Sequence, residues 1–127
     1  MDACDSGVNF MNVRKRFLAM MLAASCSGLS WPIIVNGGQE FLVEQKDKAF
    51  VHKGARVANI KVKVGDVIEF KNLDPYFHNV FSLSDVKIFD LGSYPQGHSK
   101  SVKFDKRGKV EVECAIHPEM HMIVEVE

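Results

Sequence analysis

The sequence predicts an all-β protein, an antiparallel Greek-key β-sandwich that follows an export leader. Apolar and polar residues alternate with period two in several short segments after residue 40, which is the pattern of half-buried strands. Val is frequent, and nine Phe and nine Gly accompany a single Trp, a composition that favours strands over a helical bundle. About seven short strands at this spacing indicate a sandwich.

The strands are placed by this alternation. Residues 60–64 and 68–71 each alternate apolar and charged side chains, and Gly65-Asp66 between them predicts a hairpin. The same period predicts further strands over 101–104, 110–114 and 124–126, with shorter ones over 41–43 and 50–51. Another strand is expected to begin at His78, after a turn that contains Pro75. In the 110–114 strand, the alternation places the Cys114 side chain on the inward face.

Length and charge limit the possible functions. The chain has 127 residues, 46% of them hydrophobic and 25% charged, which suits one domain. Lys plus Arg and Asp plus Glu both number 16, so the formal net charge is zero. Because no basic excess is available to neutralise phosphates, nucleic-acid binding is not expected.

The first 38 residues have the pattern of an export leader. A basic cluster at 14–16 precedes the apolar run 17–24, the order found in secretory signals. No charge follows until Glu40, so the segment is also long enough to span a bilayer, which takes about 20 residues. The leader is therefore cleaved, lipidated at Cys26, or retained as an anchor, and small and polar residues after position 24 favour cleavage. We expect residues 39–127 to be periplasmic or otherwise extracytoplasmic, with membrane contact only through a retained or lipidated leader.

Cysteine usage singles out one residue. Cys4 and Cys26 belong to the leader region, so the folded part keeps only Cys114 and cannot form an internal disulfide. A lone thiol in an exported domain suggests metal ligation, reactivity or intermolecular pairing.

Metal ligation is favoured by the residues around Cys114. His117 and Met120 follow it at intervals of three where a strand becomes a loop, and His78 offers a remote fourth donor after a turn that contains Pro75. Two imidazoles, a thiolate and a thioether are donors that favour copper over calcium, magnesium or manganese. Two His and one Cys with a weak axial Met form the ligand set of electron-transfer copper sites.

From residue 41 to the end, the chain resembles the small blue copper proteins, the cupredoxins of the plastocyanin and amicyanin group. The loop Cys-x2-His-x2-Met with Pro118 is most similar to the amicyanin type, and the segment 78–81, His-Asn-Val-Phe, resembles the region around the first copper His of plastocyanin. The resemblance implies a cupredoxin-like fold and one copper per domain.

The resemblance also assigns residues. His78, Cys114 and His117 are expected as equatorial ligands and Met120 as the axial ligand, while Asn79 is expected to tie the two ligand-bearing segments together through its side chain. Two features depart from the family pattern: Phe77 stands where a Pro usually precedes the first His, and His121 could compete with Met120 as the axial ligand.

The expected function is that of an exported, monomeric one-electron carrier and not of an enzyme, because four protein ligands leave no open coordination position. The resemblance implies a redox partner such as a periplasmic dehydrogenase, a c-type cytochrome or an oxidase, with a methylamine or other amine dehydrogenase suggested by the amicyanin-type loop. Copper binding or delivery on the same fold is the alternative, because Met120-His121-Met122 could hold Cu(I) at an edge.

Overall fold

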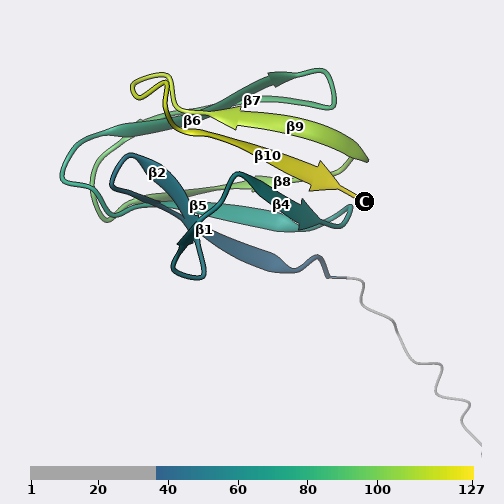
Figure 1. Ribbon diagram of the computed structural model, residues 1–127. Coiled ribbons are helices and arrows are strands. Elements are labelled where there is room, and N and C mark those ends of the chain that lie inside the picture. Colours follow the sequence, from purple (N-terminus) through teal and green to yellow (C-terminus); the bar gives the residue numbers. More distant parts are fainter. Residues whose placement is uncertain (1–36) are drawn as a thin grey trace, which may run out of the picture. The chain divides into compact units, whose positions relative to one another are not determined.

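The structure is a computed structural model that describes residues 37–127, and these form two five-stranded sheets (Figure 1). The basic cluster, the apolar run, Cys4 and Cys26 lie outside the described residues. The strands are β1 (Glu40–Lys46), β2 (Ala49–His52), β3 (Ala55–Arg56), β4 (Asn59–Val62), β5 (Val67–Asn72), β6 (His78–Ser84), β7 (Lys87–Tyr94), β8 (Ser99–Lys103), β9 (Gly108–Glu113) and β10 (His121–Val126). Within 37–127 there is no helix long and apolar enough to cross a membrane.

The two sheets confirm the predicted all-β sandwich. One sheet has the order β3-β2-β1-β5-β8 and the other β4-β10-β9-β6-β7. Most neighbouring strands are antiparallel, but β1 pairs with β5 and β10 pairs with β4 in parallel, so both sheets are mixed. Alternation along a strand reports which side chains face inward and not the direction of the neighbouring strand, so the parallel pairs could not be predicted from it.

The predicted hairpin of residues 60–64 and 68–71 is wrong, because β4 and β5 belong to opposite sheets. Gly65 takes a positive φ of 99° in the connection between them, a conformation that glycine adopts without steric cost. The buried Asp66 carboxylate accepts hydrogen bonds from the backbone amides of Lys63 and Gln39, at 2.7 Å each. This turn therefore carries the chain from one layer of the sandwich to the other.

Two strands, β3 and β7, were not predicted. β3 has only two residues, both exposed. β7 is an edge strand of its sheet, in which the apolar Ile88 lies at an exposed position and Phe89 and Leu91 are only partly buried. An edge strand with little burial lacks the periodic signal by which strands are recognised.

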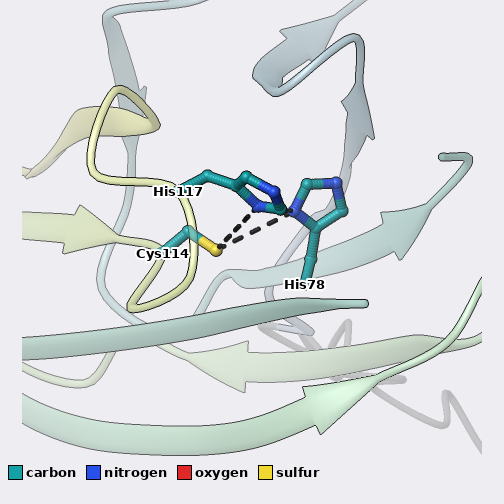
Figure 2. Close-up of side chains that lie close together, drawn as sticks. All are labelled: His78, Cys114 and His117. Carbon is teal, nitrogen blue, oxygen red and sulfur yellow. Dashed lines mark hydrogen bonds between the residues drawn. The ribbon is translucent and has the colours of Figure 1, made fainter. Parts of the chain in front are cut away.

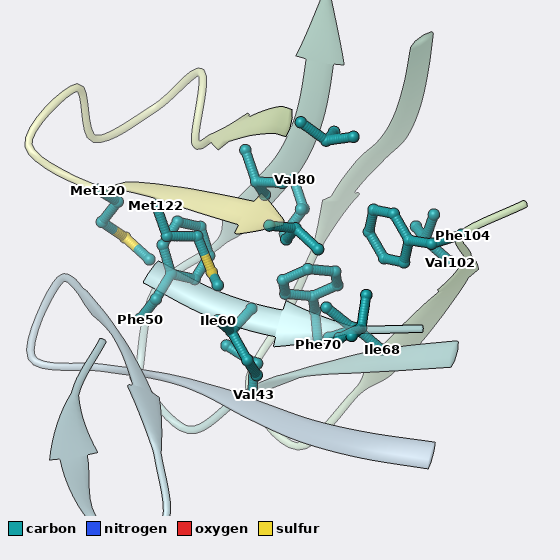
Figure 3. Packing of buried hydrophobic residues seen from close by; sticks show 14 of the residues in the cluster. Val43, Phe50, Ile60, Ile68, Phe70, Val80, Val102, Phe104, Met120 and Met122 are labelled. Carbon is teal, nitrogen blue, oxygen red and sulfur yellow. The ribbon is translucent and has the colours of Figure 1, made fainter. Parts of the chain in front are cut away.

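The core lies between the two sheets (Figure 3). Val43, Ile68 and Phe70 from one sheet pack with residues such as Val80 and Met122 from the other, and all of these are fully buried. Because β6 and β9 are antiparallel neighbours, β6 begins at the end of the sandwich where β9 ends. This geometry brings the start of β6 and the loop between β9 and β10 together.

Candidate metal centre

Cys114 follows directly after β9 and is buried, as the alternation predicted. Its Sγ accepts a hydrogen bond from the backbone amide of Asn79 in β6, with a nitrogen–sulfur distance of 3.4 Å. This hydrogen bond fixes the position of the sulfur atom, which in its thiolate form is a metal ligand. The contact also joins the two chain segments that carry the candidate donors.

The loop from Cys114 to Met120 is closed by its own backbone. The Cys114 amide donates to the Met120 carbonyl at 3.2 Å, and the Met120 amide donates to the His117 carbonyl at 2.9 Å. Pro118 restricts the backbone of the preceding His117 to extended conformations. Together these constraints turn the chain sharply and direct the His117 side chain back toward Cys114.

Three donor atoms converge at this point (Figure 2). The Nδ1 atoms of His78 and His117 lie 3.1 Å apart, and Cys114 Sγ lies 3.8 Å from the first and 3.9 Å from the second. The centre of this triangle is about 2.1 Å from each atom, close to the ~2.0–2.3 Å bonds of imidazole and thiolate with a first-row metal such as zinc. The structure therefore brings together the three predicted equatorial residues at metal-binding spacing.

The protonation of the two rings suits metal binding. Burial, reinforced by the charge of Lys48, lowers the pKa of His117, which favours its neutral ring. The second ring nitrogen of His78, Nε2, has a hydrogen-bond partner of its own, because it lies 2.8 Å from Asp74 Oδ2. With the His78 proton on Nε2, its Nδ1 lone pair is free to face Cys114 and His117.

The Tyr76 ring covers both imidazoles. Its centroid lies 5.3 Å from that of His78 and 5.2 Å from that of His117, and the two imidazole centroids are 4.8 Å apart. The Lys48 ammonium lies over the Tyr76 ring, 5.6 Å from its centroid. Tyr76 therefore shields the donor cluster with apolar ring surface, while His117 keeps partial contact with solvent.

Burial distinguishes the two candidates for the axial position. Met120 is buried at the end of the loop. His121 is exposed, and its ring lies with the carboxylates of Glu111 and Glu113, all within 4.8 Å of one another. His121 therefore belongs to the outer face of the sheet, whereas Met120 belongs to the interior.

Asn79 differs from its expected role. Its side-chain amide donates to Asp90 Oδ1 in β7 at 2.8 Å, and not to the loop that carries Cys114 and His117. The connection between the ligand-bearing segments is made instead by the Asn79 backbone amide. Sequence identifies the residue but cannot tell which of its polar groups makes the contact.

Two residues near His78 were missed as parts of the site, Asp74 and Asn72. The Asn72 side chain is buried, accepts a hydrogen bond from the Asp74 amide and donates to the Tyr76 and Tyr94 carbonyls, at 2.8, 2.8 and 3.1 Å. It thereby fixes the loop between β5 and β6. The signal in the sequence was the Asn72-x-Asp74-Pro order, which is typical of turns held by side chains.

The donor set matches copper, because two imidazole nitrogens and a thiolate, with a buried methionine in the same loop, are the ligands of electron-transfer copper proteins. A family model described as copper-binding proteins of the plastocyanin/azurin family matches residues 39–127. No curated protein sequence matches the chain.

Solved structures share the fold. A copper(I) form of one amicyanin variant has 24% identity and a TM-score of 0.61, covering 74% of this chain and 87% of that chain. A second amicyanin variant, also in the copper(I) form, has 22% identity and a TM-score of 0.61, covering 69% and 82%.

A copper-containing nitrite reductase from Thermus scotoductus has 21% identity and a TM-score of 0.60, covering 69% of this chain and 22% of that chain. The matching fold, the donor geometry and the family model agree. The chain belongs to the plastocyanin/azurin family of copper-binding proteins.

Proposed function

We propose that this protein is a type 1 copper protein that carries single electrons, with His78, Cys114 and His117 as equatorial ligands and Met120 as the axial ligand. The observation that carries the proposal is the triangle of Nδ1, Nδ1 and Sγ atoms, whose centre is at bonding distance from all three. Bound copper would alternate between Cu(II) and Cu(I), gaining one electron from a donor protein and passing it to an acceptor.

A carrier is favoured over an enzyme by the closure of the site. Cys114, His78 and Met120 are buried, and the Tyr76 ring lies against both imidazoles. A site filled by protein donors offers no position for a substrate. The hydrogen bonds of the loop and of Asn79 hold the donors in one arrangement, which suits a metal that changes oxidation state with little rearrangement.

His117 is the proposed exit for the electron, since it is the one donor of the triangle with partial exposure. Two exposed apolar side chains stand beside the donors in sequence, Phe77 before His78 and Ile116 before His117, with 55% and 45% of their surface exposed. Apolar surface around a redox centre suits the small, transient interfaces of electron-transfer proteins.

The proposed partners are redox proteins of the extracytoplasmic space: a dehydrogenase, a c-type cytochrome or an oxidase. The amicyanin-type loop supports a methylamine or other amine dehydrogenase as electron donor, by analogy. We propose that the protein acts there as a monomer, delivered by the leader in residues 1–38.

Copper delivery is less well supported than electron transfer. That alternative depended on an accessible Met-His-Met edge at residues 120–122. Met120 and Met122 are both buried, and Met122 packs in the core between the sheets, so the two thioethers are not presented to a copper acceptor.

The test is the visible spectrum of the full-length protein titrated with Cu(II). We expect an intense thiolate-to-copper band that is complete at one equivalent, absent in Cys114→Ala and retained in Met122→Leu, which changes a buried sulfur of the core. A colourless copper complex, or a band that persists in Cys114→Ala, contradicts the proposal.

A further inference from the structure

His78 is contacted at both ring nitrogens. Nδ1 faces Cys114 Sγ and His117 Nδ1, whereas Nε2 lies 2.8 Å from Asp74 Oδ2. Both side chains are buried, and Asp74 keeps only 6% of its side-chain surface exposed. A buried carboxylate in contact with a buried imidazole is costly unless it is well hydrogen-bonded, so the arrangement calls for an explanation.

The Asp74 carboxylate is oriented by a turn from a distant part of the chain. Its Oδ1 accepts the backbone amide of Asp47 at 2.8 Å, and its Oδ2 accepts that of Lys48 at 3.1 Å. Asp47 and Lys48 both have left-handed backbones, with φ of 52° and 51°, and occupy the turn between β1 and β2. Successive amides of such a turn form a concave binding site for an anion.

A hydrogen bond from its own backbone amide also holds Asp74 in place. Its own amide donates to Asn72 Oδ1, so the turn before Pro75 is closed on the side of β5. The carboxylate is therefore constrained by β5, by the β1–β2 turn and by His78 simultaneously. Because the backbone amide and both carboxylate oxygens of Asp74 are hydrogen-bonded, the position of its Oδ2 atom can determine the orientation of the imidazole.

We propose that Asp74 is a positioning residue for the copper site, which holds the proton of His78 on Nε2, aims Nδ1 at the metal and favours Cu(II) over Cu(I). The proposal rests on the function proposed above. A carboxylate behind a ligand histidine fixes its tautomer and raises its basicity. A fixed negative charge near the metal also stabilises the more positive oxidation state, which lowers the reduction potential.

The first test requires no copper. In the full-length, metal-free protein labelled with ¹⁵N, a long-range proton–nitrogen correlation spectrum identifies which nitrogen of His78 carries the proton. We expect protonated Nε2 with a slowly exchanging proton signal, and faster exchange of that proton in Asp74→Ala. A wild-type His78 that carries its proton on Nδ1 alone overturns the proposal, and this result does not depend on how any variant folds.

The second test measures the reduction potential of the copper-loaded protein. Asp74→Asn removes the charge, and Asp105→Asn is the matched control, because Asp105 is an exposed residue paired with Lys87 on the surface. We expect a positive shift for Asp74→Asn that is several times the shift for Asp105→Asn. Equal shifts in the two variants overturn the charge effect of Asp74.

The two tests distinguish this inference from the proposed function. If the wild type lacks a thiolate–copper band, electron transfer is excluded, while the metal-free spectrum still reports whether Asp74 holds the His78 proton. If the band is present and the two potential shifts are equal, the protein is a copper carrier whose potential Asp74 does not set.

Discussion

The Nδ1 atoms of His78 and His117 lie 3.1 Å apart although 39 residues separate them in the chain. The contact exists because β6 begins beside the end of β9 and because the 114–120 loop folds back on itself. Two ring nitrogens at this distance can share a proton or bind one cation between them. Because Cys114 Sγ lies within 4 Å of both nitrogens, the three atoms together have the spacing of a metal site.

The axial position can be tested with two adjacent residues. We expect Met120→Leu to raise the reduction potential of the copper-loaded protein and to alter its visible spectrum, because a thioether donor to Cu(II) is replaced by a hydrocarbon. His121→Leu should leave both unchanged, since His121 lies on the outer face with Glu111 and Glu113. A spectrum that changes in His121→Leu and not in Met120→Leu assigns the axial position to the histidine.

The apolar residues beside the site should govern association. We expect Ile116→Lys to slow electron self-exchange between two copies, measured by NMR line broadening in mixtures of oxidised and reduced protein. A roughly tenfold decrease corresponds to about 1.4 kcal/mol of added repulsion in the encounter complex. The reduction potential should change little, because Ile116 is exposed and is not a donor.

Ile88→Lys is the matched control for this substitution. Ile88 is also exposed, but it pairs with Leu83 at the far end of the β6–β7 hairpin, whereas Tyr94 pairs with His78 at the site. Equal slowing in both variants points to a general charge effect and removes the role assigned to Ile116.

Asp90 makes a pH-dependent contribution to stability. Hydrogen bonds from the Gly92 backbone amide and from the Asn79 side chain, both 2.8 Å, lower the pKa of this carboxyl. A lowered pKa in the folded state stabilises the protein above the unfolded pKa of about 3.9, and this contribution is lost as the pH falls through the folded value. The difference in unfolding free energy between wild type and Asp90→Asn should therefore shrink as the pH falls from about 6 toward 3.

Urea unfolding of the metal-free protein at several pH values measures this difference. The same comparison in an Asn79→Ala background supplies the control, because one of the two hydrogen bonds is then missing. The pH-dependent part should be smaller in that background. A difference that is constant with pH argues against a lowered Asp90 pKa.

The core between the sheets should dominate stability. Phe70 is fully buried, and its ring packs against Phe50 with centroids 5.9 Å apart. Phe70→Ala should lower the unfolding free energy by about 3–5 kcal/mol, the usual cost of deleting a buried aromatic ring. Leu83→Ala should change it by less than about 0.5 kcal/mol, because Leu83 is 76% exposed. Chemical denaturation of both variants checks the contrast.

The sequence by itself determined the class of the fold and the chemistry of the site. Period-two alternation identified the strands with one buried face, and it placed Cys114 in the interior. The spacing of Cys114, His117 and Met120 singled out a copper-type donor set, which the His78–Cys114–His117 group and the family match support. These features are local, so they can be read from neighbouring residues.

The tertiary structure decided what depends on partners distant in sequence. It placed β4 and β5 in opposite sheets, introduced two parallel strand pairs and added the edge strand β7. It placed His121 on the outer face of its sheet, and it brought the Asn79 side chain within hydrogen-bonding distance of Asp90. It also placed Asp74 between the β1–β2 turn and His78. Each of these results depends on how strands separated by many residues pair, and alternation within one strand carries no information on that choice.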